Sequence, residues 1–157
     1  MIHHFSISAK NPERVASVLA EIWQGKAYPF PPHPGSHMVV PGDEYGSLIE
    51  IYPLGTELTP SSGNEPIFSR NPSTSSLTAT HAAISVPTEA ETIAQIGDRQ
   101  GGRVQVCDRG PFRVVEFWVE NRLLLELLPP AMASEYLEFV KPENIEAYFE
   151  RASVAVG

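Results

Sequence analysis

The sequence is poor in cysteine, in positive charge and in long hydrophobic runs, and each shortage excludes a class of protein. Cys107 is the single cysteine among 157 residues, so neither an intramolecular disulfide nor a cysteine-rich zinc motif can form. The 11 Lys and Arg residues face 19 Asp and Glu residues, and the net charge of −8 disfavours binding to nucleic acids and to anionic membrane surfaces. The longest apolar stretch, residues 123–128, is interrupted by Glu126 and is far shorter than the roughly 20 residues of a membrane-spanning helix.

The residues that are present are typical of a globular protein. Hydrophobic residues make up 42% of the chain and charged residues 19%, which lies well outside the composition of disordered proteins. The length suffices for one ordinary domain or two very small ones. The first residues contain neither the basic segment nor the apolar run of a secretory signal, and we therefore expect a cytoplasmic protein.

An internal repeat organises the chain. Residues 3–9 align with residues 80–86 at a constant offset of 77, and residues 47–53 align with residues 123–129 at an offset of 76. The drift between the two alignments is one residue. The two halves are therefore predicted to have the same fold.

Each half begins with a strand that is followed by a helix. Asn11 is the predicted N-cap of the first helix, with Pro12 at its first position, and Thr88 is the predicted N-cap of the second, where Glu91 completes a capping box. We expect Gly25 to end the first helix in a left-handed conformation, as the glycine pair at residues 101–102 ends the second.

Three strands are predicted after the second helix, at residues 103–108, 112–119 and 122–128, with a tight turn at residues 120–121. The second half is thus a β-α-β-β-β module. The first half should match it, although four prolines between residues 29 and 34 predict an edge strand or a loop in place of a regular second strand.

The remaining segments divide the chain further. Residues 53–79 have little periodicity and are predicted to be an unusually long connection, and residues 134–152 are predicted to be helical with an interruption at Pro142. The expected organisation is a first module at residues 1–53, a linker at 54–79, a second module at 80–129 and a C-terminal helical extension at 130–157, all within one structural domain.

Four polar residues fall at equivalent positions of the two modules: His4 and Glu50 in the first, His81 and Glu126 in the second. Alternate side chains of a strand face opposite sides, so each His and each Glu is predicted on the side away from the helix. An ionised carboxylate within a run of leucines must be paired, protonated or bound to a metal. Two imidazoles and two carboxylates suit a divalent ion, Ni, Co, Fe, Mn or Zn rather than Ca. Surface positions and a purely structural His–Glu pair are the alternatives.

This doubled plan resembles the vicinal oxygen chelate superfamily, which comprises glyoxalase, bleomycin-resistance and dioxygenase proteins. The resemblance covers roughly residues 2–129. It implies an α+β fold in which two tandem βαβββ modules form an open, curved mixed-sheet barrel with a metal between them. The ligand set His4, Glu50, His81 and Glu126 is similar to that of bacterial-type glyoxalase I, which implies a lyase or isomerase with Glu50 or Glu126 as the catalytic base. The long linker, the C-terminal extension and the turn before the last strand depart from the family pattern.

Two other functions remain open at this point. A metal-free small-molecule-binding protein of the bleomycin-resistance type would pair Glu50 and Glu126 in salt bridges and line its pocket with aromatic residues such as Tyr52 and Trp118. An extradiol dioxygenase would use two histidines and one carboxylate, and a fourth ligand counts against it. Arg113 either holds an anionic substrate or lies at a solvated strand edge.

The expected partners are a small-molecule substrate and a second copy of the chain, without nucleic acid or membrane. The proline-rich strand and the apolar stripe of the C-terminal segment would be covered in a homodimer. Whether the two modules close one barrel within a chain or exchange between two chains is left open by the sequence.

Overall fold

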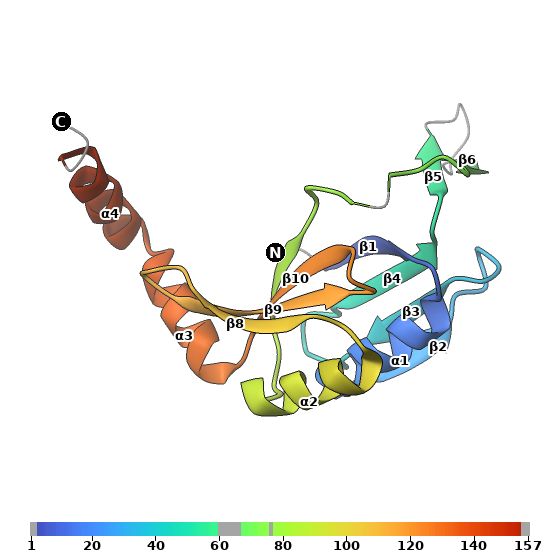
Figure 1. Ribbon diagram of the computed structural model, residues 1–157, viewed down its shortest axis with the longest axis horizontal. Coiled ribbons are helices and arrows are strands. Elements are labelled where there is room, and N and C mark those ends of the chain that lie inside the picture. The colour runs from blue at the N-terminus through green and yellow to red at the C-terminus, as the bar shows by residue number, and fades with distance from the viewer. Residues whose placement is uncertain (1–2, 60–66, 76, 155–157) are drawn as a thin grey trace. The chain divides into compact units, whose positions relative to one another are not determined.

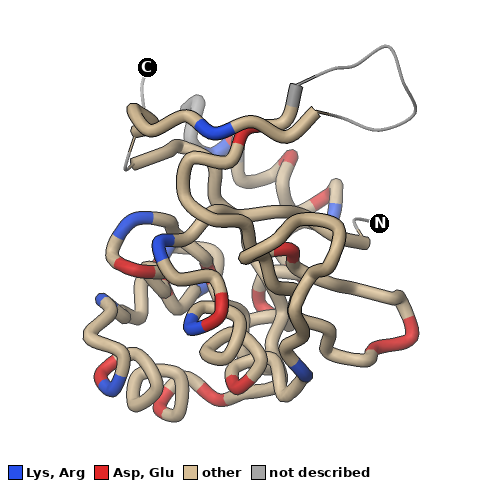
Figure 2. Tube along the Cα trace, turned by 90° about the vertical axis from the view of Figure 1, so that its right-hand side faces the viewer, with Lys and Arg blue, Asp and Glu red and all other residues tan. Residues whose placement is uncertain are grey.

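The computed structural model describes residues 3–59, 67–75 and 77–154 (Figure 1). The chain divides into two compact units, the first formed by Met1–Thr80 with Trp118–Leu123 and the second by His81–Phe117 with Leu124–Gly157. In the part of the chain that is described, no helix is long and apolar enough to cross a membrane. Lys and Arg as well as Asp and Glu are scattered along the trace, most of which is uncharged (Figure 2).

The first unit contains the predicted β-α-β-β-β module. Its elements are β1 (His4–Ala9), α1 (Pro12–Ile22), β2 (Lys26–Pro29), β3 (His37–Val40) and β4 (Leu48–Pro53). The sheet order is β1-β4-β3-β2, with β1 parallel to β4 and the other pairs antiparallel. The proline-containing β2 is an edge strand, as predicted, because proline cannot donate to a central ladder. Its covering by a second chain stays a prediction.

The second unit repeats this arrangement. Its elements are β7 (Ala82–Ser85), α2 (Ala90–Gln100), β8 (Val104–Asp108), β9 (Arg113–Val119) and β10 (Leu123–Leu128), in the sheet order β7-β10-β9-β8. His4 pairs with Leu48, 44 residues later, and Ala82 pairs with Leu125, 43 residues later. The two spacings differ by one residue, as do the offsets of 77 and 76 in the two sequence alignments. The α+β class and the two βαβββ modules are therefore confirmed.

Helix α1 packs on one face of the first sheet and leaves the other face uncovered by this helix (Figure 1). Asn11 caps the helix through its side-chain oxygen, which accepts a hydrogen bond from the backbone N–H of Arg14 at 3.0 Å. Ile49 and Ile51 of β4 are buried with the apolar stripe of the helix. The core on this side comprises Val15, Ala16, Val18, Leu19, Ala20, Ile22, Val39, Ile49 and Ile51. Residues of the opposite strand parity, including Glu50, lie on the other face.

Two predicted helix boundaries were wrong in detail. Gln24, not Gly25, has the left-handed backbone (φ 52°) after α1. Gly25 is needed for another reason, since a Cβ there would lie 2.4 Å from the carbonyl oxygen of Val40. Helix α2 has Glu89, not the predicted Thr88, as its N-cap, and Glu89 makes no side-chain cap hydrogen bond. The prediction for Gly101 was correct, with φ 66°.

The linker and the C-terminal segment are more regular than predicted. The linker forms a two-stranded antiparallel sheet from β5 (Thr56–Thr59) and β6 (Ile67–Arg70), which the lack of periodicity did not indicate. The C-terminal segment forms two helices, α3 (Pro130–Phe139) and α4 (Pro142–Val154), and the break before Pro142 is confirmed.

The tip of the β9–β10 hairpin, residues 118–123, belongs to the first unit. Glu120 and Asn121 both have left-handed backbones (φ 50° and 54°), which confirms the predicted tight turn. The Glu120 carboxylate accepts hydrogen bonds from the backbone N–H groups of Lys10 (2.6 Å) and Asn11 (2.8 Å). The start of α1 is thus held by a residue about 110 positions away in the sequence.

Candidate functional site

The first unit presents Glu50 on the sheet face opposite α1. Ser6 pairs directly with Glu50, and its hydroxyl donates to Glu50 Oε2 at 2.9 Å. The Tyr52 hydroxyl donates to the same oxygen at 3.0 Å. Within the described residues no hydrogen bond reaches Glu50 Oε1. Two neutral donors therefore orient this carboxylate through one oxygen and leave the other oxygen available.

His4 begins the strand that lies beside Glu50. It precedes Ser6 by two residues in β1, so its side chain shares the Glu50 face of the sheet, and it is exposed. The first unit thus brings one predicted imidazole and one predicted carboxylate to a single face.

Aromatic rings pack against the ring of Tyr52, whose hydroxyl holds Glu50. The ring of Tyr52, only 5% exposed, lies with centroids 6.0 Å from Phe30, 5.3 Å from His33 and 5.5 Å from Phe68. Phe68 comes from β6 of the linker and also contacts His33, at 4.9 Å. The structure therefore places Tyr52, predicted as a pocket residue, in a packed aromatic cluster that supports Glu50. The hairpin that contributes Phe68 was missed in the sequence.

Tyr52 provides a pH-dependent test of this cluster. Burial, together with the hydrogen bond to Glu50, raises the pKa of Tyr52 to about 12. The ordinary value is about 10, so the contribution of Tyr52 to stability is complete below pH 10 and is lost as the pH rises toward 12. Absorbance titration of the metal-free protein should show a tyrosine with a midpoint near pH 12 that is missing from Tyr52→Phe. A wild-type protein without such a late transition would contradict the cluster.

The second unit holds Glu126 differently. Arg109, in the turn after β8, donates from Nη2 to Oε1 of Glu126 and to Oε1 of Glu116, both at 2.8 Å. The carboxylate side chains are only 14% exposed for Glu116 and 16% for Glu126. These two hydrogen bonds raise the pKa of the Arg109 guanidinium above its usual range. The role of Glu116 was missed, because no spacing in the sequence joins it to Glu126.

His81 has the same place in the second unit as His4 in the first. It lies one residue before β7 and precedes Ala83 by two residues, and Ala83 pairs with Glu126 as Ser6 pairs with Glu50. His81 is exposed. Each unit therefore carries a His and a Glu in matching register.

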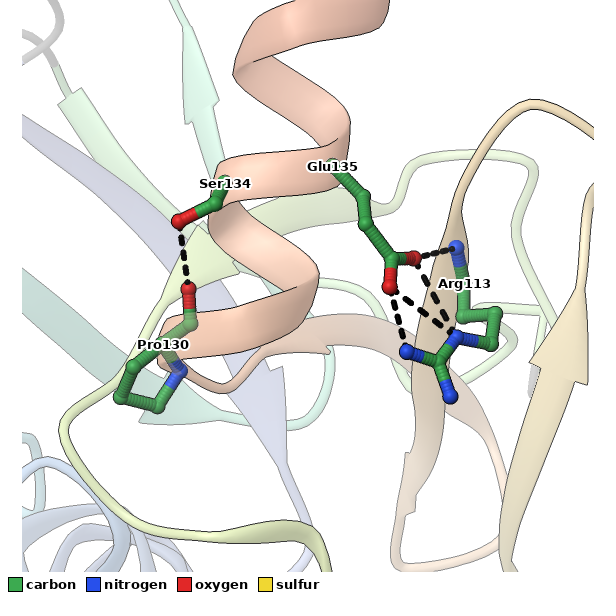
Figure 3. A network of polar contacts seen from close by, with 4 residues as sticks. All are labelled: Arg113, Pro130, Ser134 and Glu135. Carbon is green, nitrogen blue, oxygen red and sulfur yellow. Dashed lines mark hydrogen bonds and ion pairs between the residues drawn. The ribbon is translucent and has the colours of Figure 1, made fainter.

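Arg113 and Trp118 were predicted as pocket residues. The Arg113 guanidinium and backbone N–H both donate to Glu135 of α3, which ties β9 to that helix (Figure 3). This pairing raises the pKa of Arg113 and lowers that of Glu135. Trp118 is half-buried in the hairpin tip that belongs to the first unit.

No group of three or more His, Cys, Asp or Glu side chains that could hold a metal ion is found among residues 3–59, 67–75 and 77–154. His4 and Glu50 belong to the first unit and His81 and Glu126 to the second, so each unit by itself supplies two of the four predicted ligands.

Comparison with known proteins identifies the architecture. No family model matches the sequence, and no curated protein matches it significantly. Among solved structures, the fosfomycin resistance protein FosX from Mesorhizobium loti matches with a TM-score of 0.51 at 12% identity, over 81% of this chain and 88% of that one. The chain has the vicinal oxygen chelate fold.

Two further structures agree on this fold. A protein assigned to the glyoxalase family from Bacillus anthracis matches with a TM-score of 0.52 at 16% identity, over 81% of this chain and 92% of that one. FosX from Listeria monocytogenes, complexed with Mn(II) and a sulfate ion, matches with a TM-score of 0.50 at 16% identity, over 81% of this chain and 86% of that one. At these identities the likeness concerns the vicinal oxygen chelate fold alone.

Proposed function

We propose that this protein is a metal-dependent enzyme that transfers a proton on a small oxygenated substrate, as a lyase or isomerase of glyoxalase type. The observation that carries the proposal is the repeated half-site, in which each unit places a His and a Glu in registers that agree within one residue. Two imidazoles and two carboxylates suit a divalent transition ion. Mn(II) is the first ion to test, because the similar FosX was solved with it, and Ni, Co, Fe and Zn follow.

The residues proposed to hold the ion are His4, Glu50, His81 and Glu126. Glu50 fits this role, because its Oε2 is held by two hydroxyls while Oε1 has no hydrogen bond from the described residues. Metal-binding carboxylates are commonly oriented by such outer hydrogen bonds. The bound ion would supply a Lewis acid that stabilises negative charge developing on a substrate oxygen.

We assign the proton transfer to Glu50. Its hydrogen-bond partners, Ser6 and Tyr52, are neutral hydroxyl donors at Oε2. Glu50 would leave the ion to serve as base, and Oε1 is the atom that would then accept the substrate proton and return it. Tyr52 keeps its own proton at neutral pH, and the rings around it exclude water from that side. Glu126, which is ion-paired with Arg109, is assigned the role of ligand.

The proposed substrate pocket includes Tyr52, Trp118 and Arg113. Arg113 would have to leave Glu135 to bind an anionic substrate group, since the guanidinium is engaged by that carboxylate. The aromatic residues would contact the apolar part of the substrate.

A second candidate is a metal-free protein that only binds a small molecule. The ion pair between Arg109 and Glu126 favours it, because a carboxylate that already has a cation needs no metal. The aromatic cluster around Tyr52 agrees with it as well.

Replacing Glu50 by Gln tests the enzymatic proposal. Compounds with adjacent oxygens, among them an α-hydroxy ketone, a glutathione hemithioacetal and fosfomycin, would be incubated in D2O with the protein and Mn(II) or Ni(II). Nuclear magnetic resonance then follows product formation or exchange of the carbon-bound proton. Turnover by the wild type should fall by about 10²–10⁴-fold in Glu50→Gln, the usual contribution of a general base.

Lys141→Gln is the matched control. Lys141 lies just before α4, pairs with the exposed Glu138 of α3 and is not among the proposed site residues. The control should keep full activity. The proposal fails if none of the compounds is turned over with any of the metals while one of them binds equally well with and without metal, which is the behaviour of the second candidate.

A further inference from the structure

The backbone around Arg109 is fixed, whereas its side chain reaches over the sheet. The Arg109 N–H donates to the Phe112 carbonyl at 2.9 Å, and the Gly110 N–H donates to Asp108 Oδ1 at 2.7 Å. The Arg109 side chain is 36% exposed. A long side chain on a closed turn can change its partner without any change in the fold.

One nitrogen of Arg109 serves two carboxylates. Nη2 donates to Glu116 Oε1 and to Glu126 Oε1 at equal distances of 2.8 Å. The backbone position of Glu116 is fixed by the sheet, where residue 116 of β9 is paired in register with Gln105 of β8. The two hydrogen bonds go to different carboxylates, so Arg109 can lose one of them and keep the other. Without the guanidinium, the two largely buried carboxylates would repel each other.

Among the described residues of the first unit, no Lys or Arg side chain is hydrogen-bonded or ion-paired with Glu50. The residue paired with Glu50 on β3 is Met38, and the donors to Glu50 are the hydroxyls of Ser6 and Tyr52. The two half-sites match in register and differ in charge. The difference lies in Arg109 and Glu116.

We propose that Arg109 is a positioning residue that occupies Glu126 as an internal cation when no metal is bound, and that Glu116 is the anchor that retains Arg109 when a divalent ion takes Glu126. This inference rests on the proposed function, because it concerns the same carboxylate. A guanidinium and a divalent ion repel each other at one carboxylate, so binding of the ion requires Arg109 to move toward Glu116.

Two substitutions should change metal affinity in opposite directions. Arg109→Gln removes the competing cation, and the affinity for Mn(II) should rise about tenfold. Glu116→Gln replaces the charged anchor by a neutral amide, which favours the Arg109–Glu126 ion pair, so the affinity should fall by about the same factor. A general loosening of the sheet would lower the affinity in both variants.

The experiment measures Mn(II) binding isotherms on the full chain, with free Mn(II) followed by electron paramagnetic resonance. Lys141→Gln removes one positive charge elsewhere in the second unit and should bind as the wild type does. Arg109→Lys keeps the positive charge, so its affinity for Mn(II) should stay close to that of the wild type. Glu116→Gln keeps the guanidinium and tests the proposal by itself if Arg109→Gln folds poorly.

The outcomes separate this inference from the proposed function. Tighter binding by Arg109→Gln with weaker binding by Glu116→Gln supports both. If the wild type binds and Arg109→Gln binds equally or more weakly, the inference is overturned and the function stands. If Arg109→Gln binds and the wild type does not, the inference stands and the metal-dependent function is overturned. If neither protein binds Mn(II), both are overturned.

Discussion

Mn(II) is expected to raise the melting temperature of the metal-free protein by about 8–16 °C. An ion at about 1,000 times its dissociation constant adds about 4 kcal/mol to the free energy of unfolding. In a chain of this size each kcal/mol shifts the midpoint by about 2–4 °C. The proposed ligands come from both halves of the sequence, so the unfolded chain does not hold the complete site. Calorimetry in Mn(II) and in excess chelator measures the difference.

Single substitutions make this shift specific. His81→Ala and Glu126→Ala should each show a clearly smaller shift, because an affinity weakened by about 10–100-fold at the same Mn(II) concentration leaves only about 1.4–2.7 kcal/mol of the stabilisation. His3→Ala should keep the shift, because the His3 ring is hydrogen-bonded to the carbonyl of Tyr45 and is not among the proposed ligands. A wild-type midpoint that is equal in Mn(II) and in chelator would favour the metal-free binding protein.

The substitution Gly25→Ala is expected to lower the free energy of unfolding by about 3 kcal/mol or more. The added Cβ would lie 2.4 Å from the Val40 oxygen and 2.8 Å from the Pro41 Cα. Both are backbone atoms, so the connection between α1 and β2 must shift to admit the methyl group. Urea denaturation followed by circular dichroism measures the loss.

Gly101→Ala is the matched control for this prediction. Gly101 has φ 66°, and a Cβ there would meet nothing within 4 Å. In the control, only the left-handed backbone at residue 101 lowers the free energy of unfolding, by about 1–2 kcal/mol. Equal losses in the two variants would show that close approach to Val40 does not explain the glycine at position 25.

The fold could be predicted because the repeat is visible in short segments of the sequence, as alternation of polar and apolar residues and as two nearly equal offsets. Alternation in residues 3–9 and 80–86 sets which side chains share a face, and the two offsets set how strands pair. The pairing of Ser6 with Glu50 is repeated by Ala83 with Glu126, as the two offsets indicate for matching modules. The place of each His and Glu within its own module was predictable for the same reason.

Contacts between distant residues account for what the sequence did not reveal. Gly25 follows a helix, as a left-handed glycine commonly does, but the nearby β3 backbone is what requires it. Glu120 binds Lys10 and Asn11 through folding of the whole chain, and no local rule predicts that contact. Arg109 has acidic residues at several spacings, and only the sheet selects Glu116 and Glu126 as its partners.

Binding of Mn(II) to paired histidine variants tests the central claim, that one ion is held by both half-sites, most directly. The wild type should bind one Mn(II) per chain by elemental analysis after dialysis. His4→Ala and His81→Ala should each lower the affinity by about 10–100-fold or more, since each removes one ligand of the same ion. His3→Ala should bind as the wild type does. Wild-type protein without metal, or a loss of affinity confined to one of the two ligand variants, would contradict the account.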